Sequence, residues 1–185
     1  RYVLGSRGLG DVYKRQGQSA LLGGKVLIDG QPIHRPMARD QRVAYIAENP
    51  SQMMLFQDMS YLRNLTFCLP RQIDSWFRRR SIYRSLRREL TPELGAVFDK
   101  DIRDLNTQEK YALIFRRVLL QQPRVVFFEQ PFWGNDVLLQ QHIERQVQLL
   151  LAKKIAVVVL IVGIYDAFPL AERTLIYKNG HLLTQ

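Results

Sequence analysis

The chain has 185 residues, 46% hydrophobic and 24% charged, which suffices for one domain with a buried core. Its formal net charge of +10 admits an anionic partner such as a nucleic acid or a membrane surface. One cysteine, Cys68, excludes an internal disulfide framework, and the longest apolar run, Ile155 to Ile164, is too short to span a bilayer. Because the start shows no signal-peptide pattern, the sequence predicts a soluble or peripheral protein.

Residues 1–16 differ in character from the rest of the chain. Gly5 and Gly10 have the spacing of a phosphate-binding loop, but Asp11 and Val12 stand where Lys and Ser or Thr should follow. An aspartate at this position would repel a phosphate. The segment also resembles a translated adapter sequence. We therefore expect a non-native segment or a decayed phosphate loop, and the fold prediction leaves residues 1–16 out.

The first half of the chain combines short apolar segments with longer basic ones. The expected elements are strands at 25–29 and 42–47, a helix at 60–67 with Ser60 as N-cap, and a basic helical segment at 70–98 with a break near Thr91-Pro92.

The second half alternates strands and helices, which implies an α/β fold with a parallel sheet. The expected elements are an amphipathic helix at 106–122, a buried strand at 124–128, a helix at 136–153, a buried strand at 155–162, and a hairpin whose strands at 173–177 and 181–183 flank Asn179-Gly180. The apolar face of the helix at 136–153 is predicted to consist of Val137, Ile143, Val147 and Leu150.

Much of the positive charge lies in one basic stretch. Its members are Arg71, Arg78, Arg79, Arg80, Arg84, Arg87 and Arg88. We interpret it as the solvated face of a helix, with binding to nucleic acid or an anionic membrane as the alternatives. The aromatic residues between the arginines, Trp76, Phe77 and Tyr83, are interpreted as the buried side of that helix.

The order of these elements resembles that of the nucleotide-binding domain of ATP-binding-cassette (ABC) transporters. The resemblance covers about residues 23–183 and is strongest at Leu105–Leu120, Pro123–Pro131 and Lys178–Gly180. It implies an α/β fold of the P-loop NTPase type, with a mostly parallel sheet, flanking helices, a helical subdomain and a truncated N-terminal part. Residues 17–185 would form the domain, with the helical subdomain at about 62–104.

A finer resemblance connects the chain to the second cassette of sugar importers of the ribose and galactoside type. Ala47-Glu48-Asn49, followed by Leu55–Leu65, is similar to a glutamate-containing loop of that cassette, and Gly134–Val137 is similar to its G-I-D-V sequence. The lack of a histidine after the last buried strand also fits.

The resemblance assigns roles to three polar residues. Glu129 takes the position of an aspartate that holds the Mg²⁺ of Mg-ATP, with a side chain one methylene longer. Gln130 replaces the catalytic glutamate, and an amide cannot accept a proton from an attacking water, so hydrolysis should be slow or absent. Glu48 takes the position of a loop glutamine that senses the metal and contacts the membrane domain.

The same resemblance assigns roles to the start of the signature helix and to two single residues, Asp136 and Val162. Residues Asn106, Thr107, Gln108 and Glu109 replace Ser-Gly-Gly-Gln at the start of the signature helix, where Asn106 and Glu109 also form a capping box. Asp136 matches the aspartate of the loop that crosses the dimer interface. Val162 falls where a switch histidine would hold the γ-phosphate of ATP.

The function that the resemblance implies is the cassette of a membrane transporter, a carbohydrate importer, with impaired hydrolysis and a regulatory or dimerisation role. Its cofactors would be ATP and Mg²⁺. Its partners would be a second cassette, on the same chain or another, and a transmembrane permease at the cytoplasmic face of the cell membrane. Nucleic acid is not favoured. Three alternatives stay open: an active ATPase whose phosphate loop lies upstream, a basic nucleic-acid-binding module, and a fragment without its own function.

Overall fold

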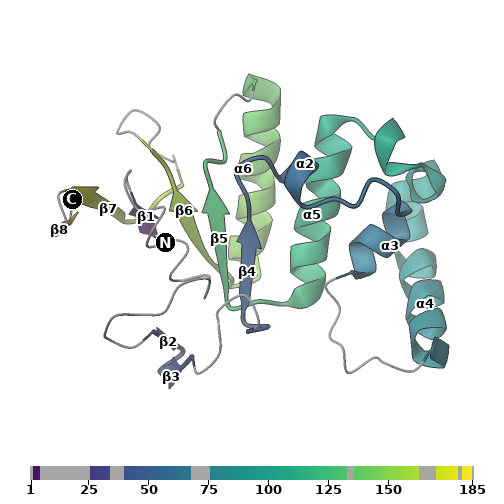
Figure 1. Cartoon of the computed structure of the whole chain (residues 1–185), viewed down its shortest axis with the longest axis horizontal. Helices are drawn as coiled ribbons and strands as arrows, with labels where there is room; N and C mark the ends of the chain where they lie inside the picture. Colours follow the sequence, from purple (N-terminus) through teal and green to yellow (C-terminus); the bar gives the residue numbers. More distant parts are fainter. Residues whose placement is uncertain are drawn as a thin grey trace. The chain divides into compact units, whose positions relative to one another are not determined.

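The computed structural model describes residues 2–4, 26–33, 40–67, 76–132, 136–162, 170–178 and 181–184 (Figure 1). They belong to two compact units. Unit 1 comprises residues 1–48 and 122–185, and unit 2 comprises residues 49–121.

Unit 1 is built on a six-stranded sheet with the strand order β4-β5-β6-β1-β7-β8. The strands are β1 (Tyr2–Leu4), β4 (Val43–Ile46), β5 (Val125–Glu129), β6 (Ala156–Leu160), β7 (Thr174–Lys178) and β8 (His181–Thr184). All neighbours pair in parallel except β7 and β8, which form the expected antiparallel hairpin. A separate two-stranded sheet joins β2 (Leu27–Ile28) to β3 (Gln31–Pro32). The predicted α/β fold with a mostly parallel sheet is therefore confirmed.

The strand β1 was not predicted, because residues 1–16 were left out of the fold prediction. Tyr2–Leu4 nevertheless pairs in parallel with β6 on one side and β7 on the other. The positions on which the expectation of a decayed phosphate loop rests, Gly5, Gly10, Asp11 and Val12, lie outside the described residues.

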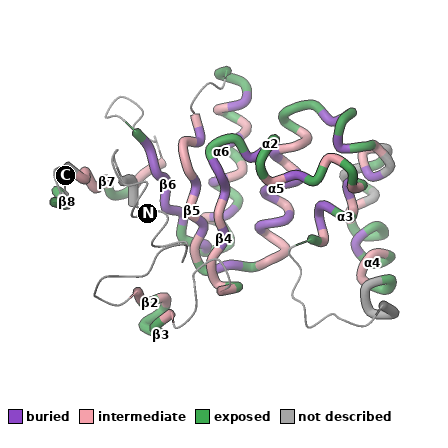
Figure 2. Tube along the Cα trace, viewed as in Figure 1, coloured by how far each residue is buried: buried purple, intermediate pink, exposed green. Residues whose placement is uncertain are grey.

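The strands β4, β5 and β6 share a buried face that belongs to the core of unit 1. Alternate residues of β4 and β5, and the matching residues of β6, are buried on this face (Figure 2): Ala44, Ile46, Val126, Phe128, Val157 and Val159. Helix α6 (Val137–Ala152) contacts β6 and buries Leu139, Ile143, Val147 and Leu150. The prediction for this helix was wrong at Val137, which is 66% exposed. Val137 is the first helical residue after the N-cap, and the buried face begins two residues later.

Two helices end in the left-handed backbone conformation, which turns the chain into the next strand. Gln122 (φ 51°) follows the helix that precedes β5, and Lys154 (φ 59°) follows α6. The start of β5 is fixed to the start of β4, because the Arg42 carbonyl accepts hydrogen bonds from the backbone N–H groups of Arg124 (2.7 Å) and Val125 (3.1 Å). These contacts set the register in which the strands meet.

Unit 2 is helical. Its elements are α2 (Pro50–Met53), α3 (Tyr61–Thr66), α4 (Trp76–Leu94), the 3-10 helices η2 (Gly95–Asp99) and η3 (Ile102–Asp104), and α5 (Thr107–Gln121). Ser60 caps α3 as expected, since its side chain accepts a hydrogen bond from the N–H of Arg63. The rings of Tyr61 and Phe98 meet edge to face, with centroids 5.5 Å apart.

The predicted break near Thr91-Pro92 was wrong, because α4 continues through Pro92 to Leu94. A proline inside a helix removes one backbone donor and crowds the preceding turn. Here the proline falls in the last turn. The helix changes to a 3-10 helix directly afterwards at Gly95, where a φ of 45° suits a glycine.

A buried asparagine holds the turn between α2 and α3. Asn64 is fully buried, and its Oδ1 accepts a hydrogen bond from the N–H of Phe56 at 2.8 Å. Its Nδ2 donates to the carbonyl groups of Phe56 (2.9 Å) and Met59 (3.1 Å). The Asn64 side chain thus provides hydrogen-bond partners for backbone groups of a segment that belongs to no helix or strand.

Replacing Asn64 with alanine should lower the free energy of unfolding of the protein by about 2–3 kcal/mol, because it removes a fully buried amide together with its part-buried hydrogen bonds to the backbone of Phe56 and Met59. Urea unfolding followed by circular dichroism measures the change. Gln52→Ala, an exposed amide in α2, is the control and should change stability by less than about 0.5 kcal/mol. Equal effects of the two substitutions would contradict this role for Asn64.

Candidate functional site

The candidate site in unit 1 lies at the carboxyl ends of β4, β5 and β6. Because these strands run in parallel, their carboxyl ends lie along one edge of the sheet, where α/β proteins commonly bind ligands. The predicted site residues of the three strands come at this edge. Glu48 follows β4 by two residues, Glu129 ends β5 with Gln130 next, and Val162 follows β6 by two residues.

The carboxylate of Glu129 is held by a tyrosine on the neighbouring strand. Tyr45 pairs in register with Phe127, two residues before Glu129, so Tyr45 and Glu129 lie on the same face of the sheet. The Tyr45 hydroxyl donates a hydrogen bond to Oε2 of Glu129. Both side chains are partly buried, and the contact orients the carboxylate. Tyr45 was not among the predicted site residues. Tyr45 alternates along β4 with the buried Ala44 and Ile46. This alternation could have predicted that Tyr45 lies on the face of the sheet opposite to theirs.

Gln130 and Val162 are brought together by the structure. The N–H of Gln130 donates to the Leu160 carbonyl at 2.7 Å, which extends the pairing of β5 with β6 by one residue. The side-chain Oε1 of Gln130 accepts a hydrogen bond from the N–H of Val162 at 3.3 Å. The predicted catalytic-glutamate and switch-histidine positions are therefore neighbours. They carry an amide and an alkyl group, and neither group takes up a proton near neutral pH.

The backbone of Gln130 adopts an uncommon conformation. Its φ is 46°, in the left-handed region that residues other than glycine, asparagine and aspartate seldom occupy. The turn directs the chain out of β5 into the buried Pro131. Such backbone strain is typical of functional turns.

Asp136 serves as the N-cap of α6. Its Oδ1 accepts a hydrogen bond from the N–H of Leu139 at 2.8 Å, so the carboxylate satisfies one of the free donors at the start of the helix. The two apolar residues that follow it, Val137 and Leu138, are each 66% exposed. Glu48 is exposed as well. The roles of Asp136 at a dimer interface and of Glu48 at a metal stay predictions.

The resemblance predicts that Glu129 holds a magnesium ion at this edge. Among the residues that the structure describes, no group of three or more His, Cys, Asp and Glu side chains could hold a metal. Magnesium in nucleotide sites usually takes one or two carboxylates and completes its shell with phosphate oxygens and water, so a single oriented carboxylate suffices. The role of Glu129 at a magnesium ion stays a prediction.

The second predicted site element is the start of α5 in unit 2. The predicted capping box is present: Oδ1 of Asn106 accepts from the N–H of Glu109, and Oε2 of Glu109 accepts from the N–H of Asn106, both at 2.8 Å. Nζ of Lys100 donates to Oε1 of Glu109 at 3.0 Å. The side chains of Thr107 and Gln108 are exposed at the helix start, where the resembling family has glycines.

The capping box lowers the pKa of Glu109 below its ordinary value of 4.5. The main cause is the hydrogen bond from the Asn106 backbone to the carboxylate. Partial burial opposes it, and Lys100 adds to it through a hydrogen bond and charge attraction.

Replacing Glu109 with glutamine should destabilise unit 2 near neutral pH. Because folding lowers the pKa of Glu109, its charge stabilises the fold above pH 4.5, and this contribution is lost as the pH falls through the lower folded value. Urea unfolding of the wild type and of Glu109→Gln should therefore differ near neutral pH and converge in acid. Glu89→Gln, at an exposed glutamate of α4, is the control. A difference that stays constant with pH would contradict the role of the charge.

No family model matches the chain. Several transporter proteins are similar to it in sequence. A putative ribose/galactose/methyl galactoside import ATP-binding protein from Pseudomonas fluorescens is 25% identical over 174 residues, which cover 87% of this chain and 33% of that protein. A similar protein from Burkholderia lata is 23% identical over 194 residues, covering 97% and 37%. The molybdenum import ATP-binding protein ModC from Mycobacterium tuberculosis is 28% identical over 165 residues, covering 86% and 43%.

Among solved structures, cbiO1 from Clostridium perfringens, part of the ABC transporter complex cbiONQ, matches with a TM-score of 0.69 and 18% identity. The match covers 98% of this chain and 74% of cbiO1. The chain spans well under half the length of the curated relatives named above. It is similar in sequence to ABC-transporter ATP-binding proteins over most of its own length, and it has the fold of an ABC cassette.

Proposed function

We propose that the chain is the ATP-binding-cassette component of a membrane importer, that the transported solute is a carbohydrate, and that this cassette binds Mg-ATP but hydrolyses it slowly or not at all. The fold and the sequence relatives support the transporter role. The two sugar-import relatives favour a carbohydrate, in agreement with the similarity of the Glu48 loop to sugar-importer cassettes.

The observation that carries the impaired hydrolysis is the contact between Gln130 and Val162. A carboxylate at position 130 would orient a water molecule and take its proton, and an imidazole at position 162 would contact the transferred phosphate. The Gln130 amide instead accepts the backbone N–H of Val162, and it cannot act as a general base. Under this proposal, this edge of the sheet lacks the proton acceptor that hydrolysis requires.

Nucleotide binding draws on different residues. Bound Mg²⁺ supplies positive charge that neutralises the phosphate oxygens. Glu129 would hold that ion, most simply through a water molecule, and the Tyr45 hydroxyl keeps the carboxylate in one orientation. The Glu129 side chain is one methylene longer than that of an aspartate, and its Oε2 is shared with the Tyr45 hydroxyl. Both features weaken the contact of Glu129 with the ion without removing it. We therefore expect this site to bind Mg-ATP without hydrolysing it.

Two exposed apolar surfaces fit the proposed partners. Val137 and Leu138 follow Asp136 directly and offer a contact surface to a second cassette. In unit 2, Met53 (72% exposed), Phe56 (39%) and Phe67 (55%) are exposed, and the rings of Phe56 and Phe67 lie 4.4 Å apart. An aromatic pair at the surface is typical of a protein interface, and a permease is the partner proposed for it.

No helix among the described residues is long and apolar enough to cross a membrane. We place the cassette at the inner face of the membrane through such a permease.

Restoring the proton acceptor should raise ATP hydrolysis. Wild-type protein should release phosphate from Mg-ATP at the background rate. Gln130→Glu should raise the rate by about 10²-fold, the usual contribution of a general base, and adding Val162→His should raise it further. Phosphate release at a nucleotide concentration well above that needed for binding is the measurement.

The matched control is Gln148→Glu, which makes the same change at an exposed position of α6 and should leave the rate at background. Rapid hydrolysis by the wild type would contradict the proposal. So would a Gln130→Glu protein that binds Mg-ATP and still hydrolyses it only at the background rate.

A further inference from the structure

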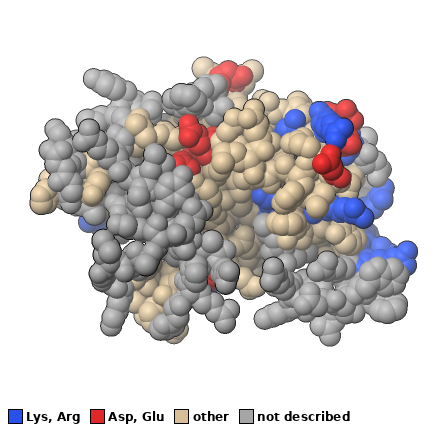
Figure 3. Space-filling model, viewed as in Figure 1, with Lys and Arg blue, Asp and Glu red and all other residues tan. Residues whose placement is uncertain are grey.

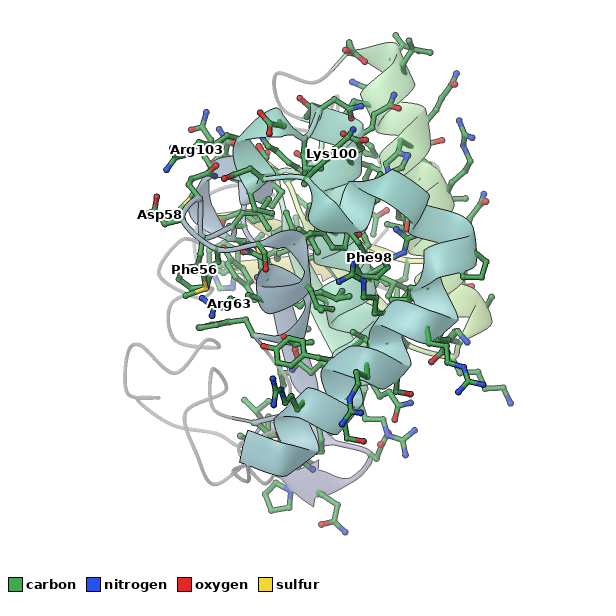
Figure 4. The ribbon with its side chains drawn as sticks, turned by 90° about the vertical axis from the view of Figure 1, so that its right-hand side faces the viewer. Phe56, Asp58, Arg63, Phe98, Lys100 and Arg103 are labelled. Carbon is green, nitrogen blue, oxygen red and sulfur yellow. The ribbon has the colours of Figure 1, made fainter. Side chains whose placement is uncertain are left out.

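The carboxylate of Glu129 is held by an uncharged group. The Tyr45 hydroxyl donates to it, and no lysine, arginine or histidine among the described residues forms an ion pair with it. Other carboxylates of the protein are paired with a cation, as in unit 2, where Oδ1 of Asp58 lies 2.6 Å from Nη2 of Arg103 (Figure 4). A hydrogen bond from a neutral phenol orients a carboxylate and leaves its negative charge in place. Glu129 therefore keeps the charge that attracts a metal cation.

The two carboxylate oxygens of Glu129 are not equivalent. Oε2 accepts the proton of the Tyr45 hydroxyl, whereas Oε1 accepts no hydrogen bond from the described residues. The proton draws electron density on Oε2 toward itself, and the hydroxyl takes up space beside that oxygen. A cation that approaches the carboxylate is therefore bound best by Oε1 alone.

The position of the Tyr45 hydroxyl is set by the sheet. Tyr45 lies opposite Phe127 in the register of β4 with β5, and Glu129 is two residues further along the same face. A tyrosine ring is rigid and turns about two side-chain torsions only, so its hydroxyl is a well-placed donor. Figure 3 shows acidic atoms at the surface near the carboxyl end of β5, where a cation from the solvent can reach them.

Magnesium and calcium ions use a carboxylate differently. Mg²⁺ binds oxygen at about 2.0–2.1 Å and demands a near-ideal octahedron. The two oxygens of one carboxylate lie too close together to fill two corners of that octahedron. Ca²⁺ is larger and tolerates irregular geometry, with about six to eight oxygens at about 2.3–2.6 Å, and it takes one or both oxygens of a carboxylate. A carboxylate with one preferred oxygen therefore suits Mg²⁺ better than Ca²⁺.

We propose that Tyr45 is a positioning residue that makes this edge of the sheet select Mg-nucleotide over Ca-nucleotide. Its hydroxyl restricts Glu129 to binding through one oxygen, which Mg²⁺ needs, and withholds the second oxygen, which Ca²⁺ could use. The inference rests on the proposed binding of Mg-ATP at this edge, and it names the residue that determines the metal preference. Hydrogen-bond partners of metal-binding side chains commonly change metal affinity about 10–100-fold, so the effect should be measurable.

Binding of the fluorescent nucleotide mant-ATP to the full chain tests the proposal, with Mg²⁺ or Ca²⁺ at concentrations that saturate the nucleotide. The wild type should bind the magnesium complex more tightly. Tyr45→Phe removes only the hydroxyl. The variant should bind the magnesium complex within a few-fold of the wild type, because loss of orientation and release of Oε2 oppose each other. It should bind the calcium complex about 10-fold more tightly. A purely structural role of Tyr45 would instead weaken the binding of both complexes.

The matched control is Tyr83→Phe, which removes a hydroxyl that lies 3.0 Å from Oγ1 of Thr66 in unit 2 and should leave both dissociation constants unchanged. Circular dichroism of each variant confirms that it is folded. If the two dissociation constants of Tyr45→Phe change by the same factor, or not at all, this inference is overturned and the proposed function stands. A wild-type protein that binds neither complex would overturn the proposed function and this inference with it.

Discussion

Parallel pairing of β4, β5 and β6 brings residues from three distant parts of the sequence to one edge of unit 1. Each strand is short and apolar, and the register from Val43 opposite Val125 to Glu129 opposite Leu160 fixes where each strand ends. The position of every candidate residue at this edge follows from that register. A shift by one residue would turn Glu129 away from Tyr45 and bury a carboxylate in the core. The apolar residues that stabilise the sheet therefore also determine which side chains could meet a nucleotide.

Local structure is well formed at the positions where the proposed function expects impaired chemistry. Gln130 makes the turn out of β5 with a left-handed backbone, and its amide bonds to Val162, although neither residue can take part in proton transfer. The start of α5 is similar. Asn106 and Glu109 cap the helix in a complete reciprocal box, while the exposed Thr107 and Gln108 carry side chains where the resembling family has glycines. Both places combine a well-formed backbone with side chains that do not favour catalysis, which agrees with the proposal of a cassette that binds nucleotide without hydrolysing it.

Much of the fold could be predicted from the sequence, because its signals are local. The apolar strands, the cap at Ser60 and the box at Asn106 depend on residues within one turn of one another. The contact of Tyr45 with Glu129 could not be predicted, since it depends on the pairing of segments 84 residues apart. The contact of Gln130 with Val162 depends on the register of β5 with β6 in the same way. The prediction of a break at Pro92 was wrong because the effect of a proline depends on how close the end of the helix lies. The strand β1 was missed because residues 1–16 were interpreted as a non-native segment or a decayed phosphate loop.

The central claim is that this edge of the sheet holds Mg-ATP without hydrolysing it, and the fate of bound nucleotide tests it most directly. The protein would be incubated with Mg-ATP, separated from free nucleotide, denatured, and the released nucleotide identified by chromatography. The account predicts that nucleotide is bound only with Mg²⁺ present and is recovered as intact ATP after long incubation, with Glu129→Ala recovering much less. Recovery of ADP from the wild-type protein would contradict the account, and so would equal recovery from Glu129→Ala.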